Sequence, residues 1–202
     1  MVVFVLPRLL IPVESTPGET RVAATPDTVK KFLSFGCDVS LERGAGTSSG
    51  YLDQAYADQG AQLIDPGDAA GWSQADILLC VQPPSAASLA RLRQGALVVG
   101  LLSPYANEEL TATLKHGALS AMALELLPRI SRAQSADALS SQANIAGYKS
   151  VLLASAALDR YFPMLMTAAG TVQPAKVVIL GAGVAGLQAV ATARHLGAVV
   201  YV

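Results

Sequence analysis

The sequence has few aromatic residues, few charges and only two cysteines. Aromatic residues make up 5% of the 202 positions and charged residues 14%, whereas hydrophobic residues make up 52%. Because this apolar surface offsets the entropy of the chain, intrinsic disorder is excluded as the main state. The shortage of aromatics argues against an aromatic-rich β module, and a length of this size allows one domain or two small ones.

The sequence also lacks an excess of either charge. Its 14 basic and 15 acidic residues give a net charge of −1, so no basic stripe offers the phosphate-neutralising surface that nucleic acid requires. The two cysteines, Cys37 and Cys80, cannot build a disulfide framework and read as small buried hydrophobes in a reducing compartment. No Cys, His and Asp residues are spaced as metal ligands, so no metal site is predicted.

No apolar run reaches the ~18 residues that cross a bilayer, and we expect a soluble chain. The first residues are apolar, but Pro7 and Arg8 interrupt them and no basic region leads them. A buried first strand at Val2–Leu6 therefore fits better than a signal peptide.

What is present is a repeating order of strand, helix and glycine. Thr25 is predicted to cap a helix with Pro26 at its first position, and Gly36 to end it. Similar units follow, with strands expected at 37–41, 61–64, 76–81, 97–102 and 119–124 and helices at 26–35, 53–59, 85–93 and 106–116. Such alternation predicts an α/β fold, a Rossmann-like and mostly parallel sheet with helices on both faces.

The pattern changes to one long helix from Ser135 to about Asp159, which Ser135 is placed to cap. Gly147 inside it costs about 1 kcal/mol relative to Ala, which favours close packing at that point. A loop is expected at Ala169–Pro174. We predict a first α/β domain at 1–136, a connecting helix at 137–164 and the start of a second Rossmann domain at 165–202.

The second domain opens with a strand, Lys176–Leu180, and a glycine-rich turn. In that turn Gly181 makes the tight bend, Gly183 lets the backbone approach a pyrophosphate, and Gly186 lets the following helix pack on the strand. The helix start adds N–H groups and positive dipole, so we predict a dinucleotide site formed by Gly181, Ala182, Gly183, Val184 and Gly186. The plainer alternative is an ordinary βα turn in a Gly- and Ala-rich protein.

A ribose-binding acidic residue is expected ~20 residues beyond the first glycine, which falls at the chain end, Val202. We therefore expect a fragment cut within its nucleotide-binding domain, one that binds NAD(H) weakly or not at all on its own.

A dense polar patch lies at residues 128–137, after the sixth expected strand and so at the carboxyl edge of the sheet. Open α/β folds bind ligands at that edge. From chemistry alone, Arg129, Arg132 and Asp137 fit a ligand site and a solvated capping turn equally well.

These residues carry a family resemblance. The run PRISRAQ at 128–134, continuing as DALSSQANIAGY at 137–148, resembles the NAD(H)-binding component of the proton-translocating NAD(P) transhydrogenase alpha-subunit family. The stretches PVE at 12–14 and ETRVAATP at 19–26, and VILGAGVAG at 178–186, resemble two signatures that this family shares with alanine dehydrogenase.

The resemblance implies two Rossmann-like domains joined by long helices, usually in a homodimer. It implies that Arg129, Gln134, Asp137 and Ser140 contact the nicotinamide end of NAD(H) and act in hydride transfer. NADP(H) is held by a partner component, and a membrane-spanning component couples the transfer to proton movement. The implied location is cytoplasmic and peripheral to the inner membrane. Direct hydride transfer needs orientation of the nicotinamide and exclusion of water rather than a nucleophile or metal.

Two departures separate the chain from alanine dehydrogenases, which resemble it next best. Gln82 stands where those enzymes have a lysine, and the Leu102-Ser103-Pro104 region lacks their histidine, so an oxo acid would have neither its cation nor its acid–base group. Gln82 also departs from the lysine we expect in many transhydrogenases, whereas Arg21 matches both subfamilies. An alanine dehydrogenase-type enzyme and an inactive scaffold or oligomerisation module remain the alternatives.

Overall fold

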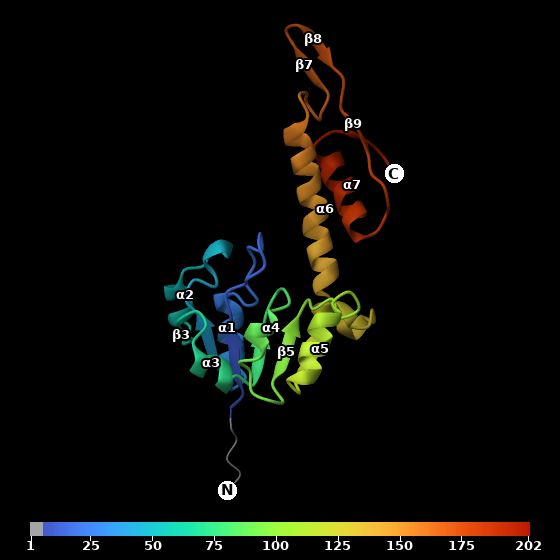
Figure 1. Ribbon diagram of the computed structural model, residues 1–202. Coiled ribbons are helices and arrows are strands. Elements are labelled where there is room, and N and C mark those ends of the chain that lie inside the picture. The colour runs from blue at the N-terminus through green and yellow to red at the C-terminus, as the bar shows by residue number, and fades with distance from the viewer. Residues whose placement is uncertain (1–5) are drawn as a thin grey trace. The chain divides into compact units, whose positions relative to one another are not determined.

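The computed structural model describes residues 6–202. These residues form two compact units, a first unit that ends at Leu127 and a second unit from Pro128 to Val202 (Figure 1). None of the helices within residues 6–202 combines the length and apolar character that a membrane crossing needs.

The first unit is built on a six-stranded, fully parallel sheet. The strands, in spatial order, are β3 (Gln62–Ile64), β2 (Asp38–Glu42), β1 (Arg8–Ile11), β4 (Ile77–Leu79), β5 (Leu97–Gly100) and β6 (Ser120–Ala123). The order reverses between β1 and β4, so the loops that follow these two strands diverge there, at the topological switch point of the sheet.

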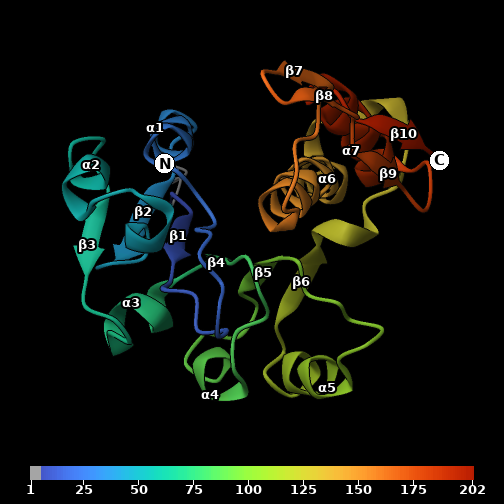
Figure 2. The same cartoon turned by 90° about the horizontal axis from the view of Figure 1, so that it is seen from above.

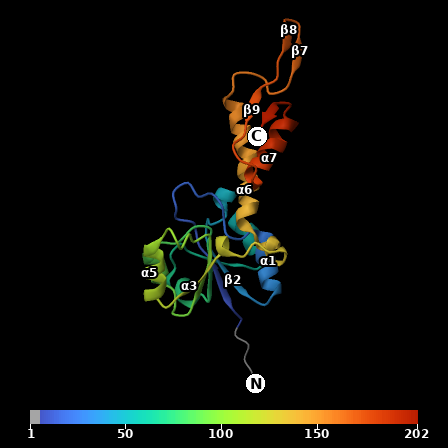
Figure 3. The ribbon, with the colours of Figure 1, turned by 90° about the vertical axis from the view of Figure 1, so that its right-hand side faces the viewer.

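Helices cover both faces of this sheet (Figures 2 and 3). One face carries α1 (Pro26–Ser34) and α2 (Asp53–Ala57), and the other carries α3 (Ala69–Gln74), α4 (Ala86–Leu89) and α5 (Glu108–His116). Alternation along β1 explains the two cores, because Leu9 and Ile11 pack with α1 and α2 while Leu10 packs with α3, α4 and α5. Two short 3-10 helices, η1 (Thr47–Ser49) and η2 (Leu124–Leu126), lie in the connections.

Local sequence explains where the helices of the first unit begin and end. The Thr25 hydroxyl accepts the Thr28 amide at 3.3 Å with Pro26 in the first turn, as predicted, and Gly36 follows the helix at φ +80°. Asn107 caps α5 in the same way through the Leu110 amide. The prediction of a parallel α/β sheet with helices on both faces is confirmed.

The second unit contains two α-helices, a 3-10 helix and two small sheets. A 3-10 helix, η3 (Ser131–Ala136), precedes the long helix α6 (Ala138–Ala157). An antiparallel pair follows, β7 (Leu165–Thr167) and β8 (Gly170–Val172), and then the parallel unit β9 (Lys176–Val178), α7 (Val184–His195) and β10 (Val199–Tyr201). The predicted strand–turn–helix–strand order from residue 176 onward is confirmed.

The core of the second unit lies between α6 and α7, which run side by side (Figures 1 and 3). Val151, Phe162 and Ala175 pack there against Ala189 and Ala193. Gly147 lies against the first turn of α7, and a Cβ built on it would meet the Ala185 carbonyl oxygen at 2.1 Å. The close packing expected at this glycine is therefore confirmed.

Several local predictions need correction. The N-cap of α6 is Asp137 rather than Ser135, which lies inside η3, because the Asp137 carboxylate reaches the Ser140 amide. The expected loop at 169–174 contains β8, and α3 was not predicted. Residues 2–5 of the expected first strand lie outside the described residues, and the strand that the structure describes there begins at Arg8.

Helices η3 and α6 belong to the second unit, which begins at Pro128. The division into 1–136, 137–164 and 165–202 therefore stays a prediction about domains.

Candidate functional site

The glycine turn of the second unit lies between the end of β9 and the start of α7. Gly181 has φ +100°, a backbone conformation that residues other than glycine rarely adopt. A Cβ on Gly186 would lie 1.9 Å from the Gly181 carbonyl oxygen, so the helix can approach the turn only because this position is glycine. The chain's own geometry thus requires both of these glycines.

Gly183 differs from both of them. Its φ of −76° is open to any residue, and a Cβ there would meet no protein atom within 4 Å. It is the N-cap of α7 and makes no side-chain capping hydrogen bond. The fold itself therefore does not require glycine here, whereas a ligand approaching the helix start would. Ala182 and Val184 flank this open position, and the five residues predicted to form the dinucleotide turn lie within 181–186, where the turn passes into the first turn of α7.

The segment predicted to contact the nicotinamide, residues 129–140, is called the nicotinamide segment, and within it the side chains of Asp137 and Ser140 are in contact. Asp137 accepts the Ser140 amide at 2.9 Å and the Ser140 hydroxyl at 2.6 Å. These two hydrogen bonds, with a smaller contribution from the charge of Arg129, hold the pKa of Asp137 below its usual range. Asp137 is therefore an ionised cap, and it fixes Ser140 at the start of α6.

The other two predicted residues are more loosely placed. Gln134 is exposed on η3, and its carbonyl accepts the Asp137 amide at 3.3 Å. Arg129 is exposed near enough to Asp137 to act on its charge. The structure thus brings Asp137 and Ser140 into contact and leaves the side chains of Gln134 and Arg129 at the surface.

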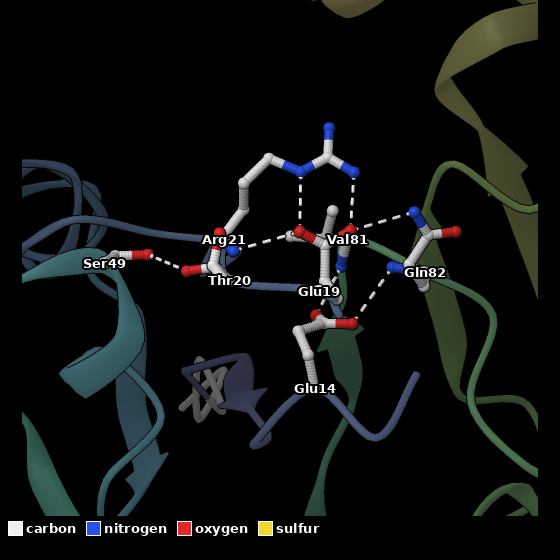
Figure 4. A network of polar contacts seen from close by, with 7 residues as sticks. All are labelled: Glu14, Glu19, Thr20, Arg21, Ser49, Val81 and Gln82. Carbon is white, nitrogen blue, oxygen red and sulfur yellow. Dashed lines mark hydrogen bonds and ion pairs between the residues drawn. The ribbon is translucent and has the colours of Figure 1, made fainter. Parts of the chain in front are cut away.

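At the switch point of the first unit, a glutamate joins two loops (Figure 4). Glu14, in the loop after β1, accepts the backbone N–H of Val81 at 2.5 Å and of Gln82 at 3.0 Å. Burial raises the pKa of Glu14 despite these hydrogen bonds, and the nearby charge of Glu19 adds to the increase.

A second glutamate at this edge binds an arginine from its own loop (Figure 4). Glu19 accepts the Nε and Nη2 groups of Arg21 at 2.7 and 2.6 Å and the Gln82 side-chain amide at 2.9 Å. The paired guanidinium is the main reason that the pKa of Glu19 is lowered, to about 2. Arg21, Glu19 and Gln82 therefore form one network.

A third carboxylate anchors the same loop. Glu42, a residue only 4% exposed, accepts the amides of Val13 and Gly67 and the indole N–H of Trp72 at 2.7–2.8 Å. A cavity of about 230 Å³ lies beside Glu14, Glu42 and Trp72. The start of the loop after β1 is thus fixed by two acceptors, Glu14 from the loop itself and Glu42 from β2.

The sequence singles out the residues of this edge but not their contacts. It marks Glu14, Glu19 and Arg21 only as a shared signature, and Gln82 only as a departure. Glu14 and Val81 are separated by 67 positions, so no local pattern signals their hydrogen bond. The one available signal is the rarity of charge itself, because an acidic residue soon after an apolar strand in a chain with 14% charge needs a partner. Within residues 6–202, no three His, Cys, Asp or Glu side chains gather as a metal ion would require.

Together, a parallel sheet with helices on both faces and a glycine-rich turn at a helix start define the class of Rossmann-like α/β proteins. Comparison with known proteins specifies the family. The profile of the "Alanine dehydrogenase/PNT, N-terminal domain" matches residues 10–146, and that of the C-terminal domain matches residues 150–202. The chain belongs to the alanine dehydrogenase/PNT family.

Individual relatives fall in both branches of this family. The chain is 46% identical over 198 residues to an NAD(P) transhydrogenase alpha-subunit protein of Rhodospirillum rubrum, covering 96% of this chain and 51% of that protein. It is 34% identical over 202 residues to an alanine dehydrogenase of Mycobacterium tuberculosis, covering 96% of this chain and 53% of that protein.

Among solved structures, a transhydrogenase is again more similar to this chain than an alanine dehydrogenase. The crystal structure of transhydrogenase from Sinorhizobium meliloti superposes with a TM-score of 0.91 at 50% identity, over 96% of this chain and 55% of that one. An L-alanine dehydrogenase structure superposes with a TM-score of 0.82 at 32% identity, over 95% of this chain and 53% of that one. The chain spans about half the length of these relatives.

Proposed function

We propose that this chain belongs to the NAD(H)-binding component of an NAD(P) transhydrogenase. The observation that carries the proposal is Gly183, because the fold leaves an open, uncapped helix start where neither the backbone conformation nor a neighbouring atom calls for glycine. The higher similarity to transhydrogenase subunits than to alanine dehydrogenases favours this branch of the family.

In this proposal the glycine turn holds the pyrophosphate of NAD(H). The N–H groups at the start of α7 would donate hydrogen bonds to the phosphates, and the helix dipole would favour their negative charge. Gly183 leaves room for the phosphates, while Gly181, Gly186, Ala182 and Val184 shape the turn around them. In this proposal the residues of the glycine turn bind and orient NAD(H) and take no part in a chemical step.

Arg129, Gln134, Asp137 and Ser140 act at the nicotinamide end. NAD(H), when bound, supplies the hydride or accepts it, and the counterpart is NADP(H) on a partner component. Ionised Asp137 holds Ser140 in place, and the exposed Gln134 amide offers a donor and an acceptor to a carboxamide. These residues therefore orient the ring and help to exclude water.

The subunit names of the relatives support an assembly with other components. We propose a homodimer that works with an NADP(H)-binding component and a membrane-spanning component, so that hydride transfer is coupled to proton translocation. The chain would then lie on the cytoplasmic side, peripheral to the inner membrane. The domain division at 136 and 164 belongs to the same proposal.

The test is binding followed by transfer. Calorimetric titration of the full-length protein with NADH should show binding, and hydride transfer to an NADP⁺ analogue should appear only after the NADP(H)-binding component is added. NADH formation from alanine and NAD⁺ by the protein alone would instead select an alanine dehydrogenase-type enzyme. No NADH binding at all would select the inactive scaffold.

A further inference from the structure

Helix α6 carries a stripe of residues that connects the two proposed ends of the cofactor site. Ser140, Asn144, Gly147 and Val151 recur at helical spacing and therefore lie on one face of α6. That face packs on α7, because Val151 shares a core with Ala189 and Gly147 lies against Ala185.

Gly147 contacts the backbone of the first turn of α7, within residues 181–186, the phosphate turn of the proposed site. A Cβ at Gly147 would lie 2.1 Å from the oxygen, 2.9 Å from the carbon and 3.0 Å from the Cα of Ala185. Ala185 is the second residue of α7 and lies between Gly183 and Gly186. Because backbone atoms cannot turn aside as a side chain can, the separation between α6 and the turn is set by the missing side chain at Gly147.

One turn before Gly147, a side-chain hydrogen bond reinforces the contact. Asn144 donates from Nδ2 to Gln188 Oε1 at 3.0 Å. Gln188 is in turn tied to Thr192, whose hydroxyl donates to the Gln188 carbonyl at 2.8 Å. Two neighbouring points of α6 therefore hold two neighbouring points at the start of α7.

The same stripe reaches the nicotinamide segment. Ser140, held by Asp137, lies two helical turns before Gly147, which is roughly 10 Å along an axis rising ~1.5 Å per residue. Both helices begin at the same end of the second unit (Figure 1). Because Gly147 lies against the first turn of α7, the part of the stripe from Ser140 to Gly147 extends beyond the start of α7.

We propose that Gly147 is a positioning residue that fixes the distance between the phosphate turn and the nicotinamide segment, with α6 as the rigid element between them. This inference rests on the proposed function, because it assumes that NAD(H) spans these two places. It predicts that a change at Gly147 moves one half of the site relative to the other without destroying either half.

The experiment uses the full-length protein and two ligands. NADH needs both halves of the site, whereas ADP-ribose has the pyrophosphate but no nicotinamide. Gly147→Ala should weaken NADH binding by about tenfold or more and ADP-ribose binding by less than about threefold, measured by calorimetry. The substitution raises helix propensity, so a loss cannot come from a weaker helix. Lys149→Ala, at an exposed position of the same helix, is the matched control and should change neither affinity.

Asn144→Ala is the second variant, since it removes the bond to Gln188 without introducing a clash. It should weaken NADH binding by about threefold and leave ADP-ribose binding unchanged. If circular dichroism shows that Gly147→Ala does not fold, Asn144→Ala alone tests the proposal. Equal losses for both ligands, or unchanged affinities in folded protein, would overturn the positioning role. Failure of the wild-type protein to bind NADH would overturn the proposed function instead, so the two failures are distinguishable.

Discussion

The two units treat the loop after a parallel strand in opposite ways. In the first unit, side chains of the loop after β1 occupy the carboxyl edge of the sheet. Glu14 accepts hydrogen bonds from the Val81 and Gln82 amides, and Glu19 accepts one from the Arg21 guanidinium. In the second unit, the helix that follows β9 has no capping side chain. The same topological position is thus occupied by the protein in one unit and left open in the other. An open helix start beside a strand end is what a phosphate-bearing ligand needs, whereas a self-paired edge offers its amides to its own carboxylates.

The largest effect on NADH binding is expected when a side chain is placed in the open turn of the second unit. Gly183→Val should reduce NADH affinity of the full-length protein by more than about 100-fold, because the new side chain occupies the space for the pyrophosphate. The fold should survive, since a Cβ at Gly183 meets no protein atom within 4 Å.

Gly186→Ala is the matched control for this prediction. Its Cβ would clash with the Gly181 carbonyl oxygen, so it should lower the Tm of the second unit as well as the affinity. An unchanged NADH titration for Gly183→Val would remove the basis for a dinucleotide site at this turn.

A second prediction concerns the exposed amide of Gln134. If it orients the nicotinamide mainly in the reacting geometry, Gln134→Ala should slow hydride transfer by roughly tenfold while the NADH Kd changes by less than about threefold. Single-turnover transfer and calorimetry on the assembled complex separate the two quantities. Equal loss in rate and affinity, or no loss in either, would favour a purely structural turn. Ser131→Ala, at the exposed start of η3, serves as the control.

The pairing of Glu19 with Arg21 at the carboxyl edge of the first unit predicts how stability depends on pH. Glu19 has a pKa of about 2 in the folded protein against 4.5 for its ordinary value, so its ionised form stabilises the fold. That stabilisation is complete above pH 4.5 and is lost as the pH falls toward 2. Glu19→Gln should lower the Tm by a few degrees at pH 7 and flatten its dependence on pH across the same window.

Thermal unfolding across this pH range, with exposed Glu109→Gln as the control, measures the effect of Glu19→Gln. A variant curve parallel to that of the wild type would show that Arg21 and Glu19 do not stabilise the edge as an ion pair.

The smallest effect is expected for Gln82→Lys. A lysine here would lie beside Glu19 and Glu14, which would pair with its charge, and the 102–104 region still supplies no histidine. We expect no alanine-dependent NADH formation in this variant. Its appearance in a spectrophotometric assay would mean that the first-unit edge is an oxo-acid site that lacks one cation.

Much of the fold was predictable because its signals are local. Thr25 and Pro26 start α1, Gly36 ends it, and the glycines at 181 and 186 mark the turn before α7. The elements that were missed have little local signal. Helix α3 has six residues with a glycine inside it, and β7 and β8 have three residues each. In segments this short the hydrophobic period does not repeat often enough to be recognised, and β7 and β8 lack the strand–helix alternation that marks the three-residue strands of the α/β units.

Prediction of the candidate site divides in the same way. The glycine turn is made within a few residues and the sequence predicts it directly, whereas the cap of α6 is equally local and the sequence predicts the wrong residue for it. Serine is a good cap, so the sequence favours Ser135, but the carboxylate of Asp137 two residues later reaches the Ser140 amide instead. Contacts such as Glu14 with Val81 depend on how strands are ordered in the sheet, which no local pattern specifies.

The strand order of the first unit also has a kinetic consequence. β1 pairs with β2 across a short stretch of chain, but it pairs with β4 only after two further βα segments have been made, and Arg8 and Asp76 at that junction are 68 positions apart. Closing the longer loop costs more chain entropy, and parallel sheets with such distant partners fold slowly. We therefore expect β1, α1 and β2 to associate early and the β1–β4 junction to close late, so that Glu14 acquires its two amide donors near the end of folding.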